Sequence, residues 1–337
     1  MPIMTNRLYP FHTGLLATDY HRFHSAPYKG SGWRLELVQP SSELPIASEV
    51  VGDKIYPAKE VVIWARNEVS AQRAADLIHS ARLLIDGSNL LSHIYPGEHA
   101  PIQAVGEEEK GVHEPVFPPN TPVVTPHIPL ACLIAARASR RLQYVYAMAK
   151  LRLSFETYSL PTIELDPQHS ANVPKSPLPE DHVRLAFAIV MAYSCIEELG
   201  FAVNASSDRP AKIGGKWSPL VKEDLEARLR KGHVKLTEAF HWTLRGARTL
   251  IEKKRVPEIV QKAKWARYPV RDGKMEIIDA INYVSFVRSK VSAHKADKRL
   301  VRVLSVYDVA NAQFLSRRLL LEKMGYWRYW GNRTSRH

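Results

Sequence analysis

Arg288 and His294 are the two side chains of this sequence best suited to chemistry on a phosphate. They lie in the segment VRSKVSAHKA, residues 287–296, with five residues between them. Histidine exchanges a proton near neutral pH, so it can take one from a ribose 2′-hydroxyl or give one to a leaving oxygen. The planar guanidinium of arginine stabilises the charge that develops on the attacked phosphate. Because the nucleophile is then the substrate's own hydroxyl, such a pair can cleave RNA without a metal ion.

The spacing of the two residues limits how they can meet. Six positions correspond to about 240° around a straight helix, so the two side chains do not share one face. They converge on one phosphate only if the helix breaks between them or if two copies of the chain meet across a dimer axis. Ser289, Ser292 and the small Ala293 permit such a break.

An arginine followed by four to six residues and a histidine also occurs by chance in a basic chain, and three further pairs have a spacing of this class: Arg7/His12, Arg73/His79 and Arg228/His233. The first lies in an irregular segment that contains proline, the second lies in the middle of an expected helix, and the third has a glycine directly before its histidine. The pair at Arg288 is set apart by long amphipathic helices on both sides, a small residue before the histidine and basic charge nearby. This context favours Arg288 and His294 as the functional pair.

The charge of the chain is concentrated in its C-terminal half. Residues 183–337 contain 31 Lys and Arg against 15 Asp and Glu, a formal net charge of +16, whereas residues 1–182 have a net charge of −3. This asymmetry indicates that the C-terminal half binds a polyanion, for which nucleic acid is the leading candidate. The alternative is a solvated basic surface or an interface with an acidic partner.

The residues expected to contact nucleic acid are cations near the Arg–His pair and residues of the basic, aromatic C-terminal end: Lys290, Lys295, Lys298, Arg299, Trp327, Arg328 and Trp330. Aromatic rings interleaved with cations suit stacking on unpaired bases. The same rings can instead pack against the rest of the domain.

Hydrophobic periodicity predicts an α+β fold that is mainly α. Strand-like runs occupy residues 33–38, 46–51 and 61–65, and helices are expected at 70–91, 128–158, 183–203, 219–231, 235–255, 276–288 and 301–324. Closely spaced prolines after residue 158 cannot continue a helix or a central strand. We therefore expect a mixed α/β domain at 1–158, a linker at 159–180, an up-and-down helical bundle at 181–325 and a tail at 326–337.

The C-terminal part, about residues 181–325, resembles the HEPN superfamily, whose catalytic members are metal-independent ribonucleases. The helix LAFAIVMAYSCIEELGF, residues 185–201, looks like the opening HEPN helix, and residues 277–321 look like its closing helices. The resemblance implies a helical bundle that forms a homodimer with both motifs lining one cleft. It assigns catalysis to Arg288 and His294, with Ser289 as the variable polar residue after the arginine. It also suggests a role in toxin–antitoxin or antiviral defence systems, with an antitoxin or defence protein as a possible partner.

Other features restrict the function further. Cys132 and Cys195 have no ligand spacing around them, so we expect a reduced, cytoplasmic protein without disulfides, metal or cofactor.

The most apolar run ends at the acidic pair Glu197–Glu198 and is too short to cross a membrane. Adjacent helical residues point about 100° apart, so only one carboxylate of this pair can face the Arg–His motif. Glu198 is the candidate auxiliary residue.

Two other classes of function remain open at this point. A non-catalytic member of the same fold would be a nucleic-acid-binding or scaffold protein, in which Arg288 and His294 are structural and paired to Glu198. A DNA-binding regulator ranks lower, because the sequence has no recognisable helix-turn-helix signature.

Overall fold

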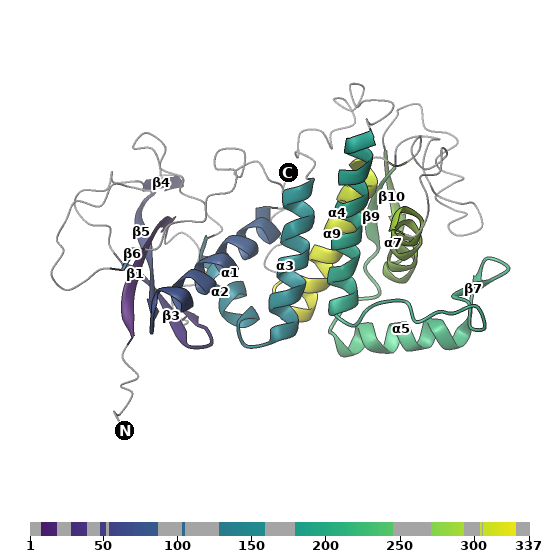
Figure 1. The fold of residues 1–337 in the computed structure, drawn as a ribbon, viewed down its shortest axis with the longest axis horizontal. Helices are drawn as coiled ribbons and strands as arrows, with labels where there is room; N and C mark the ends of the chain where they lie inside the picture. Colours follow the sequence, from purple (N-terminus) through teal and green to yellow (C-terminus); the bar gives the residue numbers. More distant parts are fainter. Residues whose placement is uncertain are drawn as a thin grey trace. The chain divides into compact units, whose positions relative to one another are not determined.

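The computed structural model describes residues 8–18, 28–38, 48–51, 54–86, 103–104, 128–158, 179–244, 271–292, 304 and 306–327 (Figure 1). The chain forms two compact units. The first covers residues 1–86 and 92–145, and the second contains residues 87–91 and 146–337. The expectation of a mainly helical α+β fold is confirmed.

The first unit combines an antiparallel sheet with two helices. Its strands are β1 (Tyr9–Thr18), β2 (Tyr28–Lys29), β3 (Trp33–Val38), β4 (Ser48–Val51), β5 (Lys54–Ala65) and β6 (Gln103–Ala104). The strand order is β2-β3-β5-β1-β6, and β4 extends the sheet by pairing with β5. Helices α1 (Glu68–Asp86) and α2 (Ile128–Ala138) pack against each other and against the sheet. In β3, buried Trp33 and Leu35 alternate with exposed Arg34 and Glu36, as a half-buried strand requires.

The single helix expected at 128–158 is wrong, because the chain breaks after α2 and resumes as α3 (Leu142–Thr157). Residues of the β2–β3 hairpin hold the break. The Ser139 hydroxyl accepts a hydrogen bond from the Ser31 amide at 2.9 Å, and Arg140 Nη2 donates to the Lys29 carbonyl at 3.0 Å. As a result Leu142, expected on the apolar face of one long helix, is 71% exposed.

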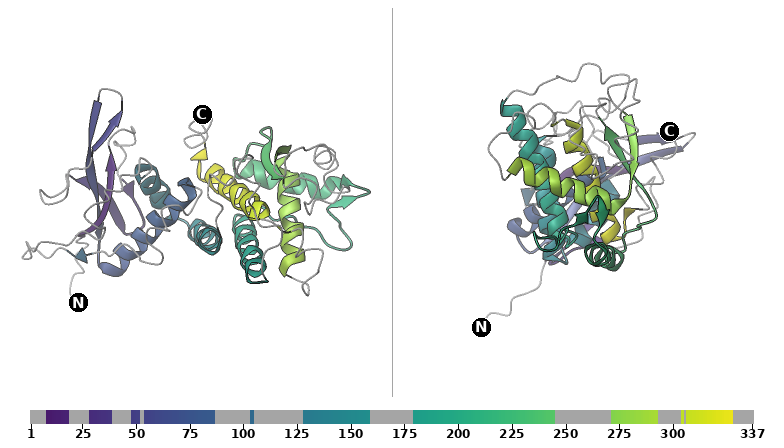
Figure 2. Two further views of the ribbon diagram at one scale, coloured as in Figure 1. Left: turned by 90° about the horizontal axis from the view of Figure 1, so that it is seen from above. Right: turned by 90° about the vertical axis from the view of Figure 1, so that its right-hand side faces the viewer.

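The described residues of the second unit form helices and two small antiparallel sheets. The helices are α3, α4 (Pro179–Glu198), α5 (Pro219–Lys231), α7 (Ile277–Ser292) and α9 (Val306–Met324). Helix α4 packs against both α7 and α9 (Figure 2). One two-stranded sheet pairs β7 (Lys212–Ile213) with β8 (Lys216–Trp217), and the other pairs β9 (Phe240–Leu244) with β10 (Arg271–Met275).

Helix α3 belongs largely to this second unit, although the sequence placed it in the N-terminal domain. The Ser154 hydroxyl donates to the Ala188 carbonyl of α4 at 2.7 Å, and Gln313 Nε2 of α9 donates to the Ser154 hydroxyl at 3.1 Å. Gln313 also donates to the Tyr158 carbonyl at 2.6 Å. The boundary between the units therefore precedes the expected linker, of which residues 159–178 lie outside the described residues.

The prediction of a helix at 235–255 is also wrong, because strand β9 begins at Phe240. Aromatic residues at alternate positions suit a strand whose one face is buried. Trp242 is 1% exposed and meets the Tyr283 ring of α7 edge-on, with a centroid distance of 5.1 Å. The buried ring packs β9, and with it the two-stranded β9–β10 sheet, against α7.

Each unit contains one cysteine, and both thiols are free and buried. Burial raises the pKa of the Cys132 thiol in α2 to about 12. Burial also raises the pKa of the Cys195 thiol in α4 well above its ordinary value.

The assignment of α3 to the second unit can be tested with two leucines of that helix. Leu151 is fully buried, whereas Leu153 is 46% exposed. We expect Leu151→Ala to lower the free energy of unfolding by about 2–5 kcal/mol, because it leaves a cavity. Leu153→Ala should change it by about 0.5 kcal/mol or less. Denaturant unfolding measured by circular dichroism compares the two, and equal effects would contradict the packing of α3.

Candidate functional site at the end of α4

Arg288 lies in the last turns of α7 and faces the last turns of α4. Its Nη2 donates to Oε1 of Glu197 at 3.2 Å, and its guanidinium carbon is 5.5 Å from the centroid of the Tyr193 ring. Tyr193 and Glu197 are four residues apart, so both present to the same side of α4. The side chains of Arg288 and Glu197 are 37% and 36% exposed, so the ion pair is in contact with water.

Tyr193 forms a rigid base under the guanidinium. The residue is 2% exposed, and it hydrogen-bonds with the side chain of Ser285 on α7 and with the backbone of Val203. Burial raises the pKa of the Tyr193 phenol, and the nearby Glu197 carboxylate adds to this effect. The ring is therefore neutral at physiological pH, and its face can attract the cation of Arg288.

Glu198, the expected auxiliary residue, points toward a different helix. Its Oε2 accepts from Lys150 Nζ of α3 at 2.7 Å, while the adjacent Glu197 is the carboxylate that contacts Arg288. The sequence singled out Glu198 as the carboxylate that faces the motif, whereas the ion pair with Arg288 is made by Glu197.

The C-terminal end of α4 attracts two further cations. Arg228 Nη1 of α5 donates to the Gly200 carbonyl at 2.6 Å, and Lys323 Nζ of α9 donates to the Leu199 carbonyl at 2.6 Å. Gly200 has a φ of +76°, which lets the chain turn while the Phe201 amide bonds back to the Ile196 carbonyl at 3.0 Å. Helix α4 therefore ends at this glycine turn, before the expected residue 203.

The segment after Arg288 is only partly described. Helix α7 continues without interruption to Ser292, so the break that the sequence permitted at Ser289 is absent. The Ser289 hydroxyl donates to the Phe286 carbonyl of its own helix at 2.8 Å, and Lys290 Nζ is 5.7 Å from the Phe286 ring centroid. The remaining expected residues of this region lie outside the described residues: His294, Lys295, Lys298 and Arg299.

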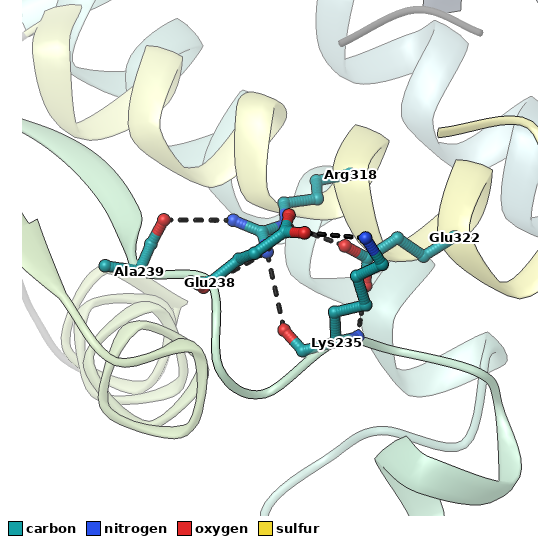
Figure 3. Close-up of polar contacts among 5 residues, drawn as sticks. All are labelled: Lys235, Glu238, Ala239, Arg318 and Glu322. Atoms are coloured by element: carbon teal, nitrogen blue, oxygen red, sulfur yellow. Dashed lines mark hydrogen bonds and ion pairs between the residues drawn. The ribbon is translucent and has the colours of Figure 1, made fainter. Parts of the chain in front are cut away.

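Trp327, expected to stack on bases, contacts a buried cation of α9. The guanidinium carbon of Arg318 is 5.5 Å from its ring centroid. Figure 3 shows the surroundings of Arg318, whose Nε donates to Glu322 at 3.0 Å and whose Nη1 donates to the Ala239 carbonyl at 3.2 Å. Its Nη2 donates to the Glu238 carbonyl at 3.1 Å. Arg328 and Trp330 lie outside the described residues.

This second arginine–glutamate pair differs from the first in burial. The side chains of Arg318 and Glu322 are 5% and 3% exposed. Burial raises the pKa of the Glu322 carboxyl, although Arg318 and the Lys235 amide act in the opposite direction. The pair therefore holds the start of β9 against α9, away from bulk water.

The sequence missed Tyr193, Glu197 as the partner of Arg288, and the Arg318–Glu322 pair. The four-residue spacing of Tyr193 and Glu197, and of Arg318 and Glu322, was the available signal. That spacing marks one face of a helix but does not say which neighbour the face meets.

The described ranges contain no group of three or more His, Cys, Asp and Glu side chains that could hold a metal ion. Across the same ranges, no helix combines the length and hydropathy that a membrane span requires. Comparison with protein-family models, curated proteins and solved structures found no match.

The two arginines provide a matched test of what each pair does. Arg318→Ala should lower the free energy of unfolding by about 3–5 kcal/mol, because it leaves the Glu322 carboxylate buried without its cation. Arg288→Ala should lower it by about 1 kcal/mol or less, since water solvates Glu197 when the cation is removed. Denaturant unfolding gives both values, and a large loss in Arg288→Ala would assign Arg288 a purely structural role.

Trp327→Ala should lower the free energy of unfolding by about 1–2 kcal/mol, through the lost cation–π contact with Arg318. It should leave RNA affinity unchanged. Trp330→Ala, three residues further along the tail, is the matched comparison. If Trp327→Ala instead weakens RNA binding with no loss of stability, the ring serves as a base-stacking platform.

Proposed function

We propose that the protein is a metal-independent endoribonuclease of the HEPN type. The observation that supports this most directly is the position of Arg288. Its guanidinium is held over the Tyr193 ring at the end of two packed helices, yet more than a third of the side chain is exposed. A fixed, accessible guanidinium at the edge of a basic domain is suited to binding a phosphodiester.

In the proposed reaction Arg288 binds the scissile phosphate and His294 exchanges the proton. The ribose 2′-oxygen attacks phosphorus and loses its proton, while the 5′-oxygen of the next nucleotide leaves and gains one. The products are a 2′,3′-cyclic phosphate and a 5′-hydroxyl, and no metal ion takes part. His294 serves as the base or as the acid in this step.

Chain geometry is compatible with this pairing. Arg288 and Ser292 are separated by about 6 Å along α7, and the two residues to His294 add at most about 7 Å. Because α7 is continuous to Ser292, the pair converges on one phosphate either just beyond the helix or across a homodimer axis. We propose the homodimer with a composite site, in a defence or toxin system with an antitoxin or defence protein as partner.

The second candidate is a non-catalytic nucleic-acid-binding or scaffold protein. The contact of Arg288 with Glu197 and Tyr193 also suits this alternative, since an arginine can join α7 to α4 without any catalytic role. The basic charge of the C-terminal half supports RNA binding in both cases.

The two candidates are separated by incubating the full-length protein with single-stranded RNA in EDTA. We expect cleavage to 2′,3′-cyclic phosphate ends, and a substrate with 2′-deoxyribose at the cut position should resist. His294→Ala and Arg288→Ala should abolish cleavage while the protein stays folded. Arg288→Lys should restore little activity, because an ammonium lacks the planar fork of donors.

His233→Asn is a suitable control, because His233 belongs to the similarly spaced Arg228/His233 pair and is exposed. Its φ of +61° is tolerated by asparagine. This variant should cleave like the wild type. Cleavage that survives in His294→Ala, or that requires Mg²⁺, would contradict the proposed mechanism, whereas RNA binding without cleavage would favour the second candidate.

A further inference from the structure

The contact between Arg288 and Glu197 has a consequence for substrate binding. We propose that the Glu197 carboxylate occupies the place of an RNA phosphate on Arg288, and that the substrate must displace it. This inference rests on the proposed function for the identity of the ligand. It makes Glu197 an internal competitor that sets the affinity of the site.

A carboxylate and a phosphodiester both accept charge-assisted hydrogen bonds from the same guanidinium donors. Oε1 of Glu197 is 3.2 Å from Nη2 of Arg288, so the carboxylate holds a donor that a phosphate would use. Both side chains are more than a third exposed, and ion pairs in water are weak enough to exchange.

Arg288 has a support that does not depend on Glu197. The Tyr193 ring attracts the guanidinium through its face and uses none of its N–H donors. Tyr193 is itself fixed by burial and by its hydrogen bonds to Ser285 and Val203. The guanidinium therefore stays in position while one anion replaces another.

The position of Glu197 in α4 also favours its pairing with Arg288. It lies in the last turn of α4, directly before Glu198, and this turn carries no basic residue. The C-terminal end of a helix has partial negative charge, so an acidic residue there is unfavourable for the helix itself. The helix dipole does not favour a carboxylate at position 197, whereas the ion pair with Arg288 does.

The Arg318–Glu322 pair shows what a permanent arginine contact looks like in the same unit. There Nε, Nη1 and Nη2 all donate to protein acceptors, and the side chains are 5% and 3% exposed. No external anion can reach that guanidinium without unfolding the cluster. The Arg288–Glu197 pair differs from this buried pair, because its exposure to water leaves the guanidinium within reach of an external anion.

The test measures binding separately from cleavage. The probe is a fluorescein-labelled single-stranded RNA with every 2′-hydroxyl methylated, so that it cannot be cut, and Kd is measured by fluorescence anisotropy in EDTA. With the full-length protein, Glu197→Gln should lower Kd by about twofold to fivefold, the range expected for removing an exposed ion pair. Glu198→Gln, which removes the same charge one residue further along, should have a smaller effect.

The role of Arg288 is isolated by a double-mutant cycle. In an Arg288→Ala background, Glu197→Gln should no longer tighten binding beyond the effect of Glu198→Gln. The proposal is overturned if Glu197→Gln weakens binding, matches Glu198→Gln, or acts equally without Arg288. Binding of the probe without cleavage of ordinary RNA would refute the ribonuclease and leave this inference standing, whereas absence of any RNA binding would overturn both.

Discussion

The contacts at the C-terminal end of α4 position the other helices of the second unit. A helix end leaves backbone carbonyls without intrahelical partners, and its negative dipole attracts cations. Here the acidic pair adds two carboxylates, and α3, α5, α7 and α9 each direct one cation to this end. Because each cation comes from a different helix, these contacts fix how far each neighbour is shifted along α4. The candidate site is a part of this arrangement that is open to water.

Helix α9 contributes a second constraint, since polar side chains on it are buried and must find partners. Ser316 donates to the Ala192 carbonyl of α4 at 2.7 Å, and Gln313 bonds to α3. Arg318 holds the residues before β9. Hydrogen bonds of this kind favour one arrangement of the helices, because any other leaves buried polar groups unsatisfied. The support behind Arg288 is therefore specified by polar contacts as well as by apolar packing.

Local signals explain which parts of the fold could be predicted from the sequence. Helix α5 begins at Pro219 and ends before Gly232, as predicted, because proline at a helix start and glycine after its end act through neighbouring residues. The break at Ser139 was missed because residues of a hairpin more than a hundred positions away in the chain hold it. Strand β9 was missed because its partner β10 lies far along the chain.

In the candidate site, too, some features could be predicted from the sequence and others depend on residues that are distant in the chain. Residue type and charge identified Arg288, and the acidic pair at the end of α4 was also noticed. Which of the two carboxylates meets Arg288 depends on the rotation of α4 about its axis, and one residue corresponds to about 100°. That rotation is set by the packing of α4 against α7 and α9, so the choice of Glu197 over Glu198 required the structure.

The two buried cysteines give the protein a pair of internal reporters. Thiol reagents attack the thiolate, and burial both suppresses ionisation and blocks access at Cys132 and Cys195. Each thiol becomes reactive only when the helix around it opens. Because one lies in each compact unit, the two labelling rates report the opening of the two units separately. Mass spectrometry of the labelled peptides can therefore compare the stability of the two units within the intact chain.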